Sequence, residues 1–194
     1  MKPRVGVLSL QGDFREHVVA MSELDCDSVA VKTVHDVLSC DGLIIPGGES
    51  TTIGKLCDRF GVGDAIRELH AQGKPIWGTC AGAILLAKEI VESDQWRLGL
   101  MDIEVARNAF GRQVDSFETD LECAEIDGGP VRAVFIRAPY ITRVFGDARA
   151  LSVFRDRIVM ARQGTLLASA FHPELTSDRR VQQYFLDMVN QARE

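Results

Sequence analysis

The first half of the chain alternates short apolar runs with segments whose apolar residues recur at helical spacing. Buried strands are predicted by the apolar runs at 4–10, 27–33, 41–46 and 75–77. Helices are predicted at 14–24, 34–38, 52–60 and 64–72. Either Ser50 or Thr51 is suited to cap the third of these helices. Strands that alternate with helices in this way predict a three-layer α/β fold, in which helices cover both faces of a mostly parallel central sheet.

From about residue 98 the pattern changes to strands with few helices between them. These strands are predicted at 101–106, 131–138, 157–162 and 165–171. A final helix is predicted at 181–189, with Val181 and Phe185 facing the core. The polar segment 107–122 gives no clear prediction. Because no linker, repeat or low-complexity stretch interrupts the chain, we predict a single domain over residues 1–194.

The segment from Gly78 to Gly82 has the sequence G-T-C-A-G and joins a predicted strand to a predicted helix at 83–87. This is the nucleophile-elbow pattern with Cys in place of Ser. Such a turn raises the central side chain, here Cys80, above the sheet and leaves room only for glycine two positions before and after it. The helix N-terminus favours a thiolate, and the Ala81 N–H is free to bond an oxyanion. The alternative is a small buried cysteine beside a tight turn.

Three loops are predicted at the edge of the sheet where the parallel strands end, which is where open α/β sheets bind ligands. They are Gln11–Gly12, Gly47–Gly48–Glu49 and Thr79–Cys80. Two glycines after a strand let backbone N–H groups approach a ligand closely, although a plain Pro-Gly-Gly turn has the same residues. The sequence therefore predicts that Gly47 and Gly48 lie beside Cys80.

One of the four histidines has the context of a catalytic base. His17, His35 and His70 fall in or beside predicted helices with polar neighbours, and we predict that they are solvated. His172 follows an apolar strand and begins an H-P-E sequence that ends at Glu174. Because a residue before proline is extended, and extended residues two apart project to the same side, Glu174 can orient the imidazole as in a catalytic triad. Alone, the pattern also fits a loop histidine beside an unrelated acid; together with a cysteine elbow it favours the triad.

The composition narrows the classes of function. The 194 residues are 46% hydrophobic and 26% charged, as is typical of a globular domain. A formal net charge of −6 without a basic stretch argues against a nucleic-acid partner. No apolar run has the length of a membrane span, and no signal-peptide pattern follows Met1. Five widely spaced cysteines without C-x-x-C favour a reducing, cytoplasmic compartment over a disulfide framework or a zinc site. We predict no metal and no cofactor.

Taken together, these motifs resemble the triad-type glutamine amidotransferases. The finer resemblance is to the glutaminase subunits of pyridoxal 5'-phosphate synthase, and the matching segments span almost the whole chain. They are LSLQGDFREH at 8–17, PGGESTT at 46–52, RNAFGRQVDSFE at 107–118, FIRAP at 135–139 and HPELT at 172–176. One departure, a shorter helix-to-strand link at 24–27, lies away from these motifs.

The resemblance implies a class I glutamine amidotransferase-like fold and hydrolysis of L-glutamine to glutamate and ammonia. Cys80 would form a thioester, His172 would act as the base, and Glu174 would orient His172. The implied oxyanion hole consists of the N–H groups of Gly48 and Ala81. The implied glutamine contacts are Gly47, Gly48, Glu49, Arg107, Ile136 and Arg137.

An arginine suits the α-carboxylate of glutamine because it can pair with it through two hydrogen bonds. Structural salt bridging is the alternative for Arg107 and Arg137, and more so for Arg112. The resemblance also implies a partner, the synthase subunit, which receives ammonia through an internal route and makes pyridoxal 5'-phosphate. We hypothesise that the Gly48 N–H points away from the site until docking of this partner orders the glycine loops and completes the oxyanion hole.

Two other classes of function stay open. A hydrolase or stress protein with a cysteine elbow on a similar sheet would depend neither on glutamine nor on Glu174. A binding module would use Cys80 only as a structural residue.

Overall fold

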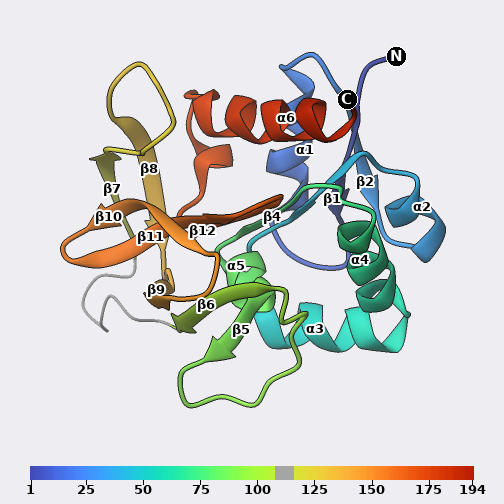
Figure 1. The fold of residues 1–194 in the computed structure, drawn as a ribbon, viewed down its shortest axis with the longest axis horizontal. Helices are drawn as coiled ribbons and strands as arrows, with labels where there is room; N and C mark the ends of the chain where they lie inside the picture. Colours follow the sequence, from blue (N-terminus) through green and yellow to red (C-terminus); the bar gives the residue numbers. More distant parts are fainter. Residues whose placement is uncertain (108–115) are drawn as a thin grey trace.

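The parallel half of the sheet follows the predicted order of strands. The computed structural model in Figure 1 describes residues 1–107 and 116–194. Its first strands are β1 (Arg4–Leu8), β2 (Asp27–Val31), β3 (Gly42–Ile45) and β4 (Ile76–Thr79). β1 pairs in parallel with β2 and β3, β3 pairs with β4, and β12 (Leu166–Ser169) lies parallel on the far side of β4. The carboxyl ends of these strands therefore meet at one edge, as the sequence predicts.

The second half of the chain extends the sheet with mostly antiparallel strands. These strands are β5 (Ala87–Ile90), β6 (Met101–Ala106), β9 (Tyr140–Val144), β10 (Arg149–Phe154) and β11 (Arg157–Gln163). The full order is β2-β1-β3-β4-β12-β11-β9-β6-β5, with β10 paired to β11. Two further strands, β7 (Ser116–Leu121) and β8 (Val131–Ile136), form a separate antiparallel pair. The sequence did not predict β5, β7, β9 or β10.

Helices cover both faces of the sheet (Figure 1). They are α1 (Phe14–Ser22), α2 (Val34–Leu38), α3 (Ser50–Arg59), α4 (Val62–Ala71), α5 (Ala81–Leu86) and α6 (Arg180–Ala192), with a 3-10 turn η1 (Pro173–Leu175). The core under α2 to α5 includes Ile53 and Leu85, whereas α1, α6 and the β7–β8 pair enclose a second core around Phe185. Ile76 of β4 points into the first core and Trp77 into the second. The three-layer arrangement is therefore confirmed.

Most helix ends differ from the predicted ones by one to three residues, and two local differences have a clear cause. The helix after the elbow stops at Leu86 instead of 87, because Ala87 starts β5 and pairs with Met101. Neither Ser50 nor Thr51 caps α3. The carboxylate of Glu49 is the cap and accepts hydrogen bonds from the backbone N–H groups of Thr51 and Thr52. None of the helices in the described parts of the chain is long and apolar enough to cross a membrane.

Candidate active site

The turn from β4 into α5 places Cys80 in a strained backbone conformation, with φ 49° and ψ −105°. A β-carbon on Gly78 would overlap the carbonyl group of Gly82, and a β-carbon on Gly82 would overlap the carbonyl oxygen of Ile45. The Cys80 N–H donates to the Ser169 carbonyl at 2.8 Å, which ties the turn to β12. The two glycines thus have the steric reason that the elbow pattern predicts.

Substitution of Gly82 by Ala is expected to destabilise the chain by about 1–3 kcal/mol or more, because the backbone of β3 must move to admit the methyl group. It should also slow iodoacetamide alkylation of Cys80. Thermal unfolding and alkylation rates measure both effects. Gly73→Asn is the matched control, since a β-carbon at Gly73 meets nothing within 4 Å and asparagine tolerates its positive φ. An unchanged Tm for Gly82→Ala would contradict the steric argument.

His172 and Glu174 form a buried hydrogen-bonded pair. The His172 Nδ1 lies 2.7 Å from the Glu174 Oε1, and both side chains are almost completely buried. Although burial opposes the charged imidazole, hydrogen bonds with Cys80 and Glu174 raise the pKa of His172 to about 10. Burial likewise opposes the Glu174 carboxylate, but His17 and His172 hold its pKa below the usual value. The arrangement suits a thiolate–imidazolium pair supported by a carboxylate.

The local backbone at this pair is not the extended one that the sequence predicted. His172 has φ −108° and ψ 84°, and Glu174 lies in the 3-10 turn η1. The His172 N–H donates to the Val134 carbonyl at 2.8 Å, which fixes the start of the turn against β8. The two side chains therefore meet through a tight turn, so the predicted pair is present but the predicted reason for it is wrong.

The helix N-terminus begins directly at the elbow. α5 has six residues, and its Ala83 and Ile84 N–H groups bond the Cys80 carbonyl. The effect of this helix end on the sulfur stays a prediction.

His17 contradicts its prediction most clearly. Its side chain is fully buried instead of solvated, and its Nε2 lies 2.9 Å from the Thr79 Oγ1 and 3.3 Å from the Glu174 Oε2. Helical spacing could have predicted this burial, because His17 stands three residues after Phe14 and four before Met21, on the inward face of α1. Of the other two, His35 is exposed as predicted and His70 is half-buried.

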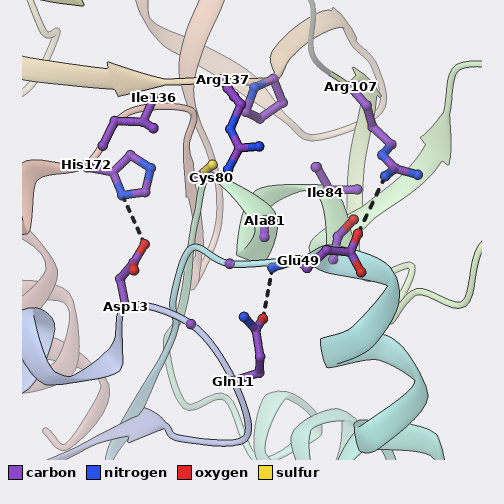
Figure 2. A pocket seen from close by; sticks show the side chains of 14 residues that line it. Gln11, Asp13, Glu49, Cys80, Ala81, Ile84, Arg107, Ile136, Arg137 and His172 are labelled. Carbon is purple, nitrogen blue, oxygen red and sulfur yellow. Dashed lines mark hydrogen bonds and ion pairs between the residues drawn. The ribbon is translucent and has the colours of Figure 1, made fainter. Parts of the chain in front are cut away.

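A cavity of about 500 Å³ lies at the carboxyl ends of the strands, against the elbow. Its lining consists of Gln11, Gly12, Asp13, Gly48, Glu49, Ser50, Cys80, Ala81, Ile84, Arg107, Ile136, Arg137, Pro139 and His172. Figure 2 shows Cys80 near His172 and Arg137, with Glu49 and Arg107 together at another part of the cavity. The three loops that the sequence placed at this edge do meet. Asp13, Ser50 and Pro139 lie inside the motifs that carry the resemblance but were given no role at the site, and Ile84 lies outside those motifs.

Gly47 does not line the cavity, although the resemblance placed it among the glutamine contacts. Its carbonyl oxygen accepts a hydrogen bond from the Asp13 N–H at 3.0 Å. A β-carbon at Gly47 would lie 2.6 Å from the His172 Cε1, so the glycine lets the imidazole pack against the backbone. Close packing thus requires a glycine at this position, and the contact with glutamine that the resemblance implies stays a prediction.

The orientation of the Gly47–Gly48 peptide decides where the Gly48 N–H points. The described chain has no cis peptide bond, so this N–H is antiparallel to the Gly47 carbonyl and points away from Asp13. The strand order puts the β3 loop between the β1 loop, which holds Asp13, and the β4 elbow. The outward orientation that we hypothesise for the undocked chain stays a prediction.

Charged groups of both signs surround the rest of the cavity. Glu49 accepts hydrogen bonds from Thr51 and Thr52, and these lower its pKa to about 2. Its Oε1 lies 3.7 Å from the Nη2 of Arg107, so the salt-bridge alternative for Arg107 is realised in part. Arg137 follows β8 with φ 41°, a strained conformation at the wall of the cavity. The remaining part of the 107–118 motif up to residue 115, including Arg112, lies outside the described residues.

One group of side chains in the described chain could offer several ligands to a metal ion, and it consists of Asp13, His172 and Glu174. Their ligand atoms lie within 4.8 Å of one another. The His172 Nδ1 and the Glu174 Oε1 already bond each other at 2.7 Å. This geometry suits an imidazole and its orienting carboxylate better than two independent metal ligands.

Comparisons with known proteins show the family of the chain. The model of the SNO glutamine amidotransferase family matches residues 7–191. The pyridoxal 5'-phosphate synthase subunit PdxT of Moorella thermoacetica is 55% identical over 96% of this chain and 99% of its own length. The corresponding subunit of Carboxydothermus hydrogenoformans is 54% identical over 96% of this chain and 97% of its own length.

Solved structures confirm the predicted fold. A glutamine amidotransferase crystal structure superposes with a TM-score of 0.91 at 49% identity and covers 96% of this chain and 98% of that one. A putative GMP synthase protein from Thermoplasma acidophilum shares the fold at 18% identity, with a TM-score of 0.74 over 100% of this chain and 96% of that one. The match of the family model over most of the chain, together with these relatives, shows that the chain belongs to the SNO glutamine amidotransferase family.

Proposed function

We propose that this chain hydrolyses L-glutamine to L-glutamate and ammonia, and supplies the ammonia to a synthase subunit that makes pyridoxal 5'-phosphate. The relatives that match over nearly their whole length are named as subunits of that synthase. The observation that carries the reaction is the 2.7 Å bond between His172 and Glu174 in the wall of a cavity that also contains the sulfur of Cys80. A cysteine, a histidine and a carboxylate in this order form an acyl-transfer triad.

In this proposal the Cys80 sulfur attacks the amide carbon of glutamine, and the carbonyl oxygen becomes an oxyanion. The N–H groups of Gly48 and Ala81 stabilise that oxyanion. His172 gives its proton to the departing ammonia, which leaves a thioester, and then takes a proton from the water that hydrolyses the thioester. Glu174 keeps the His172 ring oriented and supports its positive charge in both steps.

Glutamine recognition in this proposal uses the charges at the other part of the cavity. Arg107 and Arg137 are candidates to bind the α-carboxylate, because a guanidinium pairs with a carboxylate through two hydrogen bonds. Glu49 is an anion at neutral pH and offers a partner for the α-ammonium group. The backbone of Gly48 and the Ile136 side chain would contact the rest of the substrate.

We further propose that residues 1–194 act as one glutaminase domain in the cytoplasm. All five cysteines are free thiols, which fits a reducing compartment. The reaction as written needs no cofactor and no metal.

The competing hydrolase and binding-module hypotheses are separated by one reagent. The glutamine-like electrophile 6-diazo-5-oxo-norleucine should label Cys80 alone, and glutamine should block the labelling. A hydrolase with another substrate would show no protection by glutamine. A binding module with a structural Cys80 would not be labelled.

Partner dependence gives the test of the proposed function. The orientation of the Gly47–Gly48 peptide in the structure is held by a hydrogen bond from the Asp13 N–H to the Gly47 carbonyl, and the adjoining Glu49 N–H donates to the Gln11 Oε1 at 2.9 Å. A peptide between two glycines reverses at little steric cost, so the free chain is expected to populate both orientations and docking to select one. Because one oxyanion donor contributes about 10²–10³ in rate, ammonia release from glutamine should rise by up to that factor on titration with the synthase subunit. Full activity of the chain alone, unchanged by the partner, would contradict this selection; no ammonia release in either state would contradict the glutaminase itself.

A further inference from the structure

His17, the last residue of the 8–17 motif, connects α1 to the floor of the active site, although the sequence predicted no role for it. Its Nε2 lies 2.9 Å from the Thr79 Oγ1, one residue before Cys80, and 3.3 Å from the Glu174 Oε2. The side chains of His17 and Glu174 are both completely buried, and the His17 ring packs edge-on against Trp77 at 5.7 Å. A polar ring buried in this way has a fixed position and fixed neighbours.

The second oxygen of Glu174 needs a donor. The first oxygen, Oε1, accepts a hydrogen bond from the His172 Nδ1. The second oxygen, Oε2, is buried and accepts no hydrogen bond from the residues that the structure describes. Leaving a carboxylate oxygen without a donor in the interior is costly. The His17 Nε2 faces Oε2 at 3.3 Å, close enough for a charge–dipole contact that small movements would convert into a hydrogen bond.

The surroundings select one tautomer of His17. A hydrogen on Nε2 lies between two acceptors, the Thr79 Oγ1 and the Glu174 Oε2, whereas a bare Nε2 would face the carboxylate with its lone pair. Burial lowers the pKa of His17, against the opposing effect of Glu174, so the ring is a neutral donor at neutral pH. His172, Asp13 and Glu16 are the other charged or titratable groups that act on the ring. A neutral donor supports the carboxylate without placing a second cation beside His172.

We propose that His17 is a positioning residue for the glutaminase reaction: its Nε2–H fixes the second oxygen of Glu174, and through it the plane in which His172 is held. This inference rests on the proposed function. It assigns α1 a part in catalysis, because the same hydrogen links Glu174 to Thr79 and hence to the elbow. His17 itself does not line the cavity, so its effect on glutamine binding should be small.

The test compares His17→Gln, His17→Asn and His17→Leu in the complex with the synthase subunit. A glutamine amide extends to the position of the imidazole Nε2, an asparagine amide reaches only to that of Nδ1, and leucine has no donor. Partners that orient a functional histidine typically contribute about 10–100-fold in activity. We expect the Asn and Leu variants to lose that much kcat with KM nearly unchanged and with the acidic limb of the pH profile shifted upward. The Gln variant should stay within a few-fold of the parent chain.

Three further measurements distinguish a loss of positioning from a loss of folding and from a failure of the proposed function. His70→Leu, at a half-buried histidine on α4 away from the site, is the matched control and should leave kcat and the pH profile unchanged. Thermal unfolding shows whether each variant folds; if Leu does not, the Gln–Asn comparison is sufficient. If His17→Gln and His17→Asn lost kcat equally, and in proportion to their loss of Tm, the positioning role would be overturned. Iodoacetamide alkylation of Cys80 needs no glutamine, so a parent chain that is alkylated rapidly but releases no ammonia would overturn the proposed function instead.

Discussion

Replacing Cys80 by Ala is expected to lower kcat for ammonia release by a factor on the order of 10⁴ or more, because the thioester can no longer form. No other thiol in the chain is placed to substitute for it. Burial raises the pKa of Cys26 to about 11 and that of Cys57 to about 12, and it also raises the pKa of Cys40 and Cys123. These four side chains are therefore neutral and enclosed at the pH of the assay. The measurement is steady-state glutaminase activity with the synthase partner at saturation.

Ala substitutions at the other four cysteines are the matched controls. Each should retain activity wherever the variant folds, although Cys57→Ala leaves a small cavity under α3 and lowers Tm. Labelling by 6-diazo-5-oxo-norleucine should disappear only in Cys80→Ala. If a folded Cys57→Ala chain lost turnover while Cys80→Ala kept it, the assignment of the nucleophile would be wrong.

Four of the predicted strands are buried along almost their whole length. β1, β3, β4 and β12 are buried on both faces by helices, so their apolar runs stand out in the sequence. β9 and β10 lie in the antiparallel extension and expose charged side chains such as Arg143 and Arg149. β7 does alternate, with Phe117 and Leu121 more buried than their neighbours, but the polar residues around it hid the pattern. A strand whose partner covers only one face cannot be recognised from a continuous apolar run.

The site could be predicted where a short sequence motif determines both the backbone conformation and the position of the side chain. The elbow around Cys80 is of this kind, since a β-carbon at Gly78 or Gly82 would overlap neighbouring backbone atoms. His17 was missed because the polar residues Arg15 and Glu16 directly precede it, whereas burial on a helix depends on residues three and four positions away. Glu49 was not predicted as the cap of α3, because Ser50 and Thr51 also satisfy the local preference and only the longer carboxylate reaches both N–H groups.

Substitution of Glu174 by Gln is expected to reduce kcat on the order of 10²–10⁴-fold with a much smaller change in KM, because an amide keeps the shape of the side chain but not its charge. The upper value is the loss found when the carboxylate of a serine-protease triad becomes an amide. The interaction strengthens when His172 is positively charged, so it acts mainly in the transition state. Without the carboxylate, the pKa of His172 should fall from about 10, and the basic limb of the activity profile should move to lower pH.

The same variant makes a prediction for stability. In the parent chain the raised pKa of His172 contributes stability that is complete below its unfolded value of about 6.5 and is lost as the pH rises toward about 10. The depressed pKa of Glu174 contributes stability above its unfolded value of about 4.3, which is lost as the pH falls through the folded value. The free energy of unfolding of the parent chain, measured with denaturant at several pH values, should therefore fall toward both acidic and basic pH. In the Glu174→Gln chain it should fall less steeply on both sides. Glu68→Gln, the same change at an exposed acid on α4, is the control and should alter neither kcat nor the dependence of stability on pH. A Glu174→Gln chain with normal kcat and a raised KM would instead make Glu174 a substrate-binding residue.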